Sequence, residues 1–354
     1  MALKTWLQQF AIEAPTGEYA GALTVLHYTS PAAELAALRS ACGVFDLGWR
    51  GKLVVSGEDR VRWLNGMVTN NTRDLAQDAG NYSFVLNPQG RIQNDLVAFQ
   101  RGDFYMVETE AAQAPALKEF FERYIIMDDV EIGDLGARLT SIGVGGPQAA
   151  AVLAKAGLLS GELRTGQLHD ASFHGMGYTL VRDAIAARDW YELWLSADNA
   201  AAFWQALTAA GGVPVGAQAL EWQRLLLGLP RVGVEIGAKV LPQETGQMYA
   251  LHHAKGCYIG QEIVERIHSR GQVHRALSGL VVESDDAAAP AIGSKVLAGD
   301  QEIGEVASSA VIPVDGAERV VALAYLRRDD GVEKDDLTVE GHGARRSPLP
   351  FQFS

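Results

Sequence analysis

The stretch that organises this chain lies near three-quarters of its length and reads Lys255-Gly256-Cys257-Tyr258-Ile259-Gly260-Gln261-Glu262. It combines a thiol, a cation, a phenol, an amide, a carboxylate and two glycines. Cys257 is one of only two cysteines in the chain. A thiol near a lysine, between glycines that permit close approach of a backbone or a ligand, indicates a functional site more than a packed core.

The length and composition indicate which class of protein this chain belongs to and how many domains to expect. The chain has 354 residues, of which 48% are hydrophobic and 21% charged, and its mean hydropathy is close to zero. This is the composition of a soluble globular protein. Because one hydrophobic core does not organise so long a chain, we expect two or three domains, or one domain interrupted by another.

The charge balance excludes two classes of partner. A net charge of −13 argues against binding to nucleic acid or to an anionic membrane, since both need basic patches. No apolar run approaches the roughly 18 to 20 residues that span a bilayer. The N-terminus is polar and acidic too early for a secretory signal and lacks the bias of a transit peptide, so we predict a cytoplasmic protein.

The cysteines and histidines predict neither a disulfide nor a metal site. Cys42 and Cys257 are far apart in sequence and form no zinc-binding spacing. Cys42 lies in an apolar segment and is expected to be a small buried hydrophobe. Four histidines lie near Cys257 but without further paired ligands: His252, His253, His268 and His274.

The order of elements predicts two α+β portions followed by a β-rich portion. In the first, helices are expected at 31–41, 58–67 and 112–126, a strand, turn and strand over 43–57, and strands at 82–86, 92–99 and 103–107 around a turn at 87–90. In the second, strands are expected at 140–144, 177–182 and 190–196, and helices at 147–156, 197–210 and 216–228. Short apolar runs at 277–282, 295–297, 302–308, 319–326 and 337–339 then predict a small antiparallel barrel or sandwich. The spacing over 260–267 fits a helix and a strand equally well.

Cys257 and Lys255 are the first candidates for chemistry. A thiol becomes a usable nucleophile when a nearby cation or helix N-terminus lowers its pKa, and Lys255 supplies a cation two residues away. The alternative is a tight structural loop with a packed cysteine.

Asp95 and Asn94 are the second candidates, because they interrupt an apolar strand. A carboxylate there is costly to bury unless it is paired or used. Asp95 therefore accepts a hydrogen bond from a ligand amine or acts as a general base, unless it points to solvent or caps a turn. Arg224 is either an exposed i,i+3 ion pair with Glu221 or a local cation for an anionic ligand.

The motif at 255–262, followed by Arg270-Gly271 and Arg275, resembles the signature of the YgfZ-type folate-binding proteins. These are relatives of the glycine-cleavage T-protein, an aminomethyltransferase, and they assist iron–sulfur cluster assembly or repair. Weaker similarities to this superfamily occur in the right order along nearly the whole chain, at 43–47, 51–52, 69–70, 82–90, 94–96, 224–230 and 303–306.

The resemblance implies an α+β, three-domain GcvT-like folate-binding fold: two α+β domains and a C-terminal antiparallel β-barrel around a central cavity that holds tetrahydrofolate. The domains expected are a discontinuous folate-binding domain at 1–50 and 140–250, an inserted domain at 51–139, the motif segment at 251–272 and the barrel at 273–354. Nothing in the sequence demands more than a monomer.

The resemblance also implies roles for individual residues. Carried over by position, Tyr82, Asn94 and Asp95 line the pterin side of the cofactor, and Arg224 lies near the folate. Lys255 and Cys257 form the functional pair of the family. Three further residues of the motif are expected to contact the cofactor: Tyr258, Gln261 and Glu262.

Two departures from the T-protein pattern bear on activity. Those enzymes have an Asp-Asp pair where this chain has Asn94-Asp95, and a pterin-binding Glu where this chain has Arg188. The first hypothesis is therefore a tetrahydrofolate-binding accessory protein with Cys257 as its reactive group, whose transient partners are iron–sulfur enzymes or assembly proteins. The alternative is a folate-dependent aminomethyl or one-carbon transferase in which Asp95 steers a folate nitrogen.

Overall fold

The computed structural model describes residues 3–7, 13–136, 138–271, 273–283, 288–328 and 337–353. Two compact units make up the chain. Unit 1 comprises Met1–Val85, Asn94–Leu220 and Ala254–Tyr258, and unit 2 comprises Leu86–Gln93, Glu221–His253 and Ile259–Ser354. No helix in the described ranges is long and apolar enough to cross a membrane.

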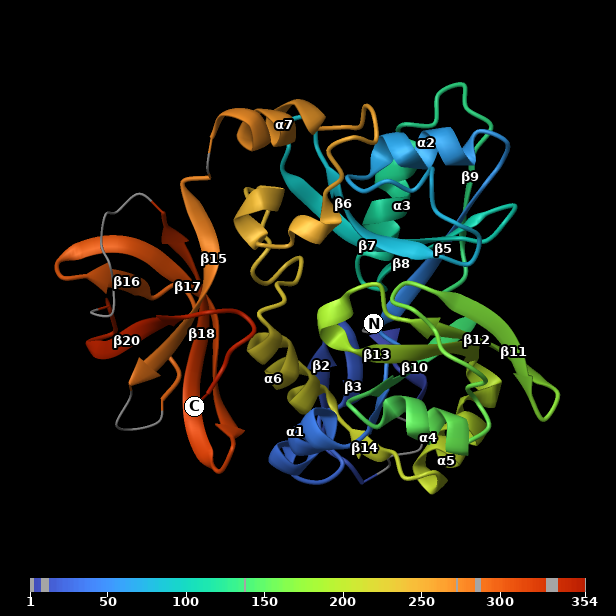
Figure 1. The fold of residues 1–354 in the computed structure, drawn as a ribbon, viewed down its shortest axis with the longest axis horizontal. Helices are drawn as coiled ribbons and strands as arrows, with labels where there is room; N and C mark the ends of the chain where they lie inside the picture. Colours follow the sequence, from blue (N-terminus) through green and yellow to red (C-terminus); the bar gives the residue numbers. More distant parts are fainter. Residues whose placement is uncertain are drawn as a thin grey trace. The chain divides into compact units, whose positions relative to one another are not determined.

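Unit 1 is built on a six-stranded and a five-stranded sheet (Figure 1). In sheet order, the six-stranded sheet contains β11 (Leu168–Phe173), β12 (Met176–Arg182), β13 (Trp190–Ser196), β10 (Leu139–Gly145), β4 (Gly43–Asp46) and β14 (Val213–Val215). The five-stranded sheet contains β6 (Gly80–Leu86), β7 (Ile92–Gln100), β8 (Tyr105–Glu110), β5 (Arg50–Ser56) and β9 (Glu131–Asp134). A small third sheet joins β1 (Leu3–Lys4), β3 (Ala22–Val25) and β2 (Thr16–Tyr19).

Helices cover one face of each large sheet, because those faces carry the apolar side chains. On the six-stranded sheet, Val152 of α4 (Ala149–Lys155) and Phe203 of α5 (Ala200–Ala209) join one core with Ile142 and Leu193. On the five-stranded sheet, α2 (Arg60–Met67) and α3 (Ala114–Glu122) contact β5. Apolar burial of this kind contributes roughly 25 cal/mol per Å² of surface removed from water.

The uncovered faces of the two large sheets meet inside unit 1. Lys52 of β5 donates a hydrogen bond to Ser141 of β10 over 2.7 Å, and the rings of Phe99 and Trp194 pack edge to face at 5.1 Å. The layer between the sheets therefore contains charged as well as aromatic side chains.

Unit 2 contains a closed six-stranded antiparallel barrel. Its strands in barrel order are β15 (Arg275–Glu283), β18 (Ala317–Arg327), β17 (Gln301–Val314), β16 (Lys295–Ala298), β19 (Leu337–Val339) and β20 (His342–Ser347). Small and β-branched residues such as Val296, Ala322 and Ala324 fill its interior. Closure leaves no free edge in the barrel, which decides between the predicted barrel and sandwich.

The remaining helices are α1 (Pro31–Ser40), α6 (Ala217–Leu227), α7 (Gln261–Arg270) and the short 3₁₀ turns at Ala186–Arg188, Ala197–Asn199, Pro242–Thr245 and Met248–Ala250. The predicted helix at 31–41 is confirmed and begins as its residues dictate: Ser30 caps it, accepting from Ala33 N over 3.2 Å, and Pro31 stands at its first turn. The ambiguous stretch at 260–267 is a helix, with Val264 fully buried.

The predictions failed at several element ends and polar strands. The helix predicted to reach 126 ends at Glu122, because β-branched isoleucines at 125 and 126 are poor helix residues and the chain turns there toward β9. Strands β9, β11, β14 and β20 were not predicted, since they are short or carry exposed polar residues with little apolar alternation.

Candidate functional site

Tyr82 and Asp95 are brought together on the five-stranded sheet. Tyr82 in β6 is buried, and its hydroxyl donates a hydrogen bond to Oδ2 of Asp95 in β7 over 2.8 Å. Asp95 is half-buried. One oxygen of the carboxylate is thus held by a phenol from the neighbouring strand, which fixes the orientation of an acidic group at the edge of the protein interior.

Asn94 does not share this position. Successive strand residues point to opposite faces of a sheet, so Asn94 faces the helix-covered side while Asp95 faces the layer between the sheets. Asn94 Oδ1 accepts from Asp95 N over 2.7 Å and from Thr109 Oγ1 over 3.1 Å. Thr109 Oγ1 also lies 2.9 Å from the carbonyl oxygen of Asp95. The buried amide therefore fixes the backbone that carries Asp95.

Asp95 belongs to a row of polar residues that crosses the sheet. Lys52 of β5 is paired in register with Glu108 of β8, and Glu108 is paired with Val97 of β7. Val97 and Asp95 are two residues apart and lie on the same face of β7. Two residues before Lys52 on β5, Arg50 is paired with Glu110 of β8. The face that carries Asp95 thus also carries two cations and two further carboxylates.

The buried members of this row form an ion-pair cluster between the sheets. Glu108 Oε1 lies 2.8 Å from Lys52 Nζ, and Glu108 Oε2 lies 3.3 Å from Arg50. Glu192 of β13 contacts the same group, and Trp194 Nε1 donates to Glu192 Oε2 over 3.1 Å. Sequence reasoning did not select Arg50, Lys52, Glu108 or Glu192, although Lys52, Glu108 and Glu192 carry the signal that selected Asp95, a charge inside an apolar strand.

Lys255 is buried at the C-terminal end of α2 in unit 1. Its ammonium group donates to the backbone carbonyl oxygens of Asn65 and Val68, and Asn65 Nδ2 donates back to the Lys255 carbonyl over 3.3 Å. Its Nζ lies 5.0 Å from the ring centroid of Tyr258. A cation at helix C-terminal carbonyls is favourable, but burial, with a smaller contribution from Arg73, lowers the pKa of Lys255 to about 7.

Cys257 differs from Lys255 in exposure. Cys257 is exposed and forms no disulfide, whereas Cys42 is buried as predicted, and burial raises the pKa of Cys42 to about 11. Between Lys255 and Cys257, Gly256 has a φ of +93° that L side chains rarely adopt. The segment therefore fixes its lysine inside the protein and presents its thiol to solvent.

The end of the motif belongs to unit 2, where Gly260 precedes α7. Gly260 has a φ of +79°, and a Cβ there would lie 2.5 Å from the Asn87 carbonyl oxygen. A Cβ on Gly90 would lie 2.7 Å from Cβ of Ile263. Both glycines therefore allow the turn after β6 to pack against the first turn of α7.

Gln261 and Glu262 open that helix. Gln261 is half-buried, while the side chain of Glu262 is 81% exposed and pairs with Arg266 over 2.7 Å, an i,i+4 contact on the outer face of the helix.

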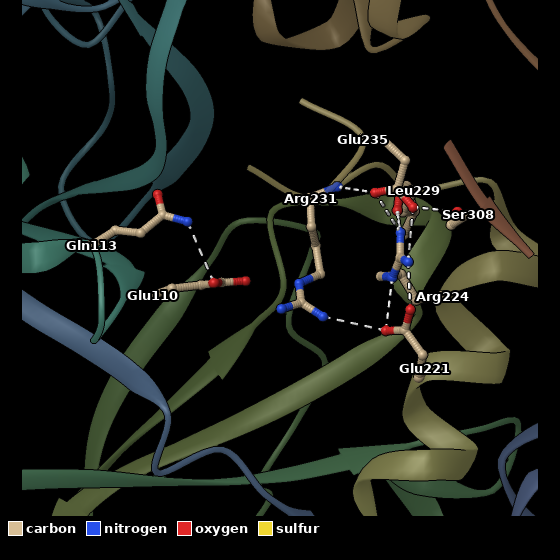
Figure 2. Close-up of polar contacts among 8 residues, drawn as sticks. All are labelled: Glu110, Gln113, Glu221, Arg224, Leu229, Arg231, Glu235 and Ser308. Carbon is tan, nitrogen blue, oxygen red and sulfur yellow. Dashed lines mark hydrogen bonds and ion pairs between the residues drawn. The ribbon is translucent and has the colours of Figure 1, made fainter. Parts of the chain in front are cut away.

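Arg224, also in unit 2, lies between two carboxylates (Figure 2). It contacts both oxygens of Glu235 at 3.0 and 2.9 Å and both oxygens of Glu221 at 3.0 and 2.5 Å, and it donates to the Leu229 carbonyl over 2.7 Å. The predicted i,i+3 pair with Glu221 is present, but Arg224 is buried, not exposed. With every nitrogen engaged, the guanidinium organises the loop after α6.

Arg188 occupies the position at which the T-protein pattern has a pterin-binding Glu. In the structure it lies at the end of a 3₁₀ turn and pairs with the buried Asp183 at 3.2 Å. Its guanidinium lies 5.4 Å from the ring centroid of Trp190. Within the described ranges, no three His, Cys, Asp or Glu side chains are grouped to hold a metal ion.

Comparison with known proteins identifies a family and several relatives. The family model described as "GCVT N-terminal domain" matches residues 8–255. An aminomethyltransferase of Thermus thermophilus is 30% identical over 341 residues, which cover 94% of each chain. An aminomethyltransferase of Rubrobacter xylanophilus is 28% identical over 346 residues, covering 96% of this chain and 91% of its own.

A solved structure with the same fold is the glycine cleavage system aminomethyltransferase T from Bartonella henselae. It matches with a TM-score of 0.88 over 99% of this chain and 98% of its own, at 23% sequence identity. Because the sequence identity is low, this match establishes the fold alone. That fold, α+β sheets followed by the closed barrel, is the one predicted from the sequence.

Proposed function

The chain belongs to the family of the GCVT N-terminal domain, and from that membership we propose that it binds a tetrahydrofolate species and acts on a one-carbon unit, in the manner of an aminomethyltransferase. The relatives that carry this name match it over nearly their full length. That match supports the transferase hypothesis more than the accessory one.

The observation that carries the proposal is the hydrogen bond from Tyr82 to Asp95. A carboxylate with one oxygen held by a phenol keeps lone pairs on the other for a donor on the ligand. A folate nitrogen that is about to receive the one-carbon unit still carries its N–H and is such a donor. Asp95 would orient that nitrogen and accept its proton, while positioning supplies most of the rate acceleration.

The other predicted residues receive supporting roles in this proposal. Asn94 fixes the backbone of Asp95 in unit 1, and Arg224, paired with Glu221 and Glu235, fixes the loop after α6 in unit 2. Tyr258, with Gln261 and Glu262, remains a proposed contact for the cofactor.

The test combines binding with turnover. Calorimetric titration with tetrahydrofolate measures binding, and formation of methylene-tetrahydrofolate from amine donors measures transfer. We expect saturable binding and measurable transfer in the wild type, and loss of transfer in Asp95→Asn. Folate binding without turnover on any donor would overturn the transferase part of the proposal and favour the second candidate below.

The second candidate is an accessory role in iron–sulfur cluster assembly or repair in the cytoplasm, favoured by the exposed thiol of Cys257 next to an anchored Lys255. The presence of Arg188 where the T-protein pattern has a Glu also supports it. Lys255 would then anchor the backbone of the segment that exposes Cys257 to solvent. The partners would be iron–sulfur proteins.

Cys257→Ser tests this role in cells under oxidative stress, with the activity of an iron–sulfur enzyme as the readout. Cys42→Ser is the matched control, because it removes the buried thiol. Reduced enzyme activity with Cys257→Ser alone supports the role; equal activity in the wild type and both variants contradicts it.

A further inference from the structure

Two arginines of this chain are almost equally buried but differ in how many contacts they make. The side chain of Arg224 is 8% exposed and that of Arg50 is 9% exposed. Arg224 donates to both oxygens of two carboxylates and to one backbone carbonyl. Among the described residues, Arg50 contacts one acceptor, Oε2 of Glu108, at 3.3 Å, and its Nε is buried without a hydrogen-bond partner. Arg50 is therefore the arginine with donors to offer.

The one carboxylate that contacts Arg50 is shared with a second cation. Oε1 of Glu108 lies 2.8 Å from Nζ of Lys52, and Lys52 also donates to the hydroxyl of Ser141 over 2.7 Å. Lys52 is thus held inside the layer between the sheets, whereas a guanidinium has five N–H donors and Glu108 takes up only part of them. Because a buried donor without an acceptor is costly, the free donors of Arg50 indicate a place for an acceptor from a ligand.

Arg50 lies on the sheet face that carries Asp95. It is paired in register with Glu110 of β8, and the register of β8 with β7 pairs Glu108 with Val97. Two residues further along this antiparallel register, Glu110 stands opposite Asp95. Neighbouring strands lie about 4.8 Å apart, so the backbones of Arg50 and Asp95 are about 10 Å apart in one row. A bicyclic ring above this row can meet both side chains.

The charges on this face favour a neutral acceptor over an anion. Asp95, Glu108 and Glu110 all lie on it, and their carboxylates would repel a further negative charge. A carbonyl oxygen accepts a hydrogen bond from a guanidinium without adding a charge. In tetrahydrofolate the ring carbonyl at C4 lies beside N5, whereas the glutamate end of the molecule carries carboxylates. The ring carbonyl is therefore the acceptor that suits Arg50.

We propose that Arg50 is a specificity-determining residue: it donates a hydrogen bond to the C4 carbonyl of the tetrahydropterin ring, while Asp95 contacts a nitrogen of the same ligand. A ligand without that carbonyl leaves the guanidinium unpaired and loses affinity, because a site built to hydrogen-bond a group rejects the analogue that lacks it. This inference rests on the proposed folate site and adds the part of the ligand that the site selects.

The test compares tetrahydrofolate with its 4-amino analogue, tetrahydroaminopterin, by calorimetric titration. The analogue places a donor where the carbonyl oxygen was. We expect the wild type to bind tetrahydrofolate roughly ten- to a hundredfold more tightly than the analogue. Arg50→Met should bind the two ligands with similar affinity, through loss of affinity for tetrahydrofolate. Arg101→Met is the matched control, because Arg101 is 13% exposed and is paired with Asp78 at 2.9 Å; it should keep the wild-type preference.

The outcomes separate this inference from the proposed function. Equal binding of both ligands by the wild type overturns the role of Arg50 and leaves the folate site in place, and this measurement does not depend on the folding of any variant. An unchanged preference in a folded Arg50→Met, or an equal loss of preference in Arg101→Met, also overturns it. Binding of neither ligand by the wild type contradicts the folate site and this inference with it.

Discussion

The hydroxyl of Tyr82 lies 2.8 Å from Oδ2 of Asp95 and donates a hydrogen bond to it across neighbouring strands. The phenol is buried while the carboxylate is half-buried. The buried phenol orients the carboxylate of Asp95, and the partial exposure of Asp95 leaves this carboxylate accessible to a ligand. Recognition of a ligand amine requires both properties.

Tyr82→Phe should weaken tetrahydrofolate binding, because it removes the donor that orients Asp95. A hydrogen bond to a charged group contributes about 1.5 to 3 kcal/mol, so we expect a loss of affinity of roughly ten- to a hundredfold, measured by calorimetry. Tyr105→Phe is the matched control, since its hydroxyl donates to the Thr72 carbonyl over 2.9 Å instead. Equal losses in both variants would contradict a specific role for Tyr82.

Lys255→Met should change how stability depends on pH. The pKa of Lys255 falls on folding from its ordinary value of 10.5 to about 7, so the unfolded state binds more protons between these values. The free energy of unfolding of the wild type therefore rises with pH in this window, by up to about 1.4 kcal/mol per unit, relative to Lys255→Met. Denaturant unfolding at several pH values measures the difference; parallel curves for the two proteins would rule out this titration.

The two thiols should react at very different rates. Cys257 is exposed, whereas Cys42 is buried and burial raises its pKa to about 11, which suppresses the reactive thiolate. A thiol reagent should modify one cysteine of the native protein quickly and the second only after unfolding. Cys257→Ser should abolish the fast phase and Cys42→Ser should preserve it; a fast phase that survives in Cys257→Ser contradicts the assignment.

Gly260→Ala should destabilise the protein more than Gly256→Ala does. Both positions have positive φ values, so each substitution strains the backbone at a cost of about 1 kcal/mol. Only at Gly260 would the new Cβ also meet a backbone atom, the Asn87 carbonyl oxygen at 2.5 Å, while nothing lies within 4 Å at Gly256. We expect the midpoint of thermal unfolding to fall further for Gly260→Ala, and equal shifts would contradict the packing described here.

The sequence predicted those helices and strands whose ends are marked by their own residues. Ser30 and Pro31 mark the start of α1, and regular apolar runs mark most barrel strands. It failed where tertiary contacts decide, as in the polar strand β20 of the barrel.

The same limit applies to the site. A charge in an apolar strand identified Asp95, and the same signal was present at Glu108 and Glu192. The strand register pairs Lys52 with Glu108, and only the packing of the two sheets brings Glu192 of β13 to them. Sequence alternation assigns a residue to a face but does not identify its neighbours on other strands.

Calorimetric titration of wild type and Asp95→Asn with tetrahydrofolate tests most directly whether Asp95 recognises the folate. Asparagine keeps the shape of the side chain and an acceptor for Tyr82 but removes the negative charge. We expect saturable one-to-one binding to the wild type and at least about tenfold weaker binding to the variant, a difference of about 1.4 kcal/mol. Absence of binding to the wild type, or equal affinity of the two proteins, would contradict this role of Asp95.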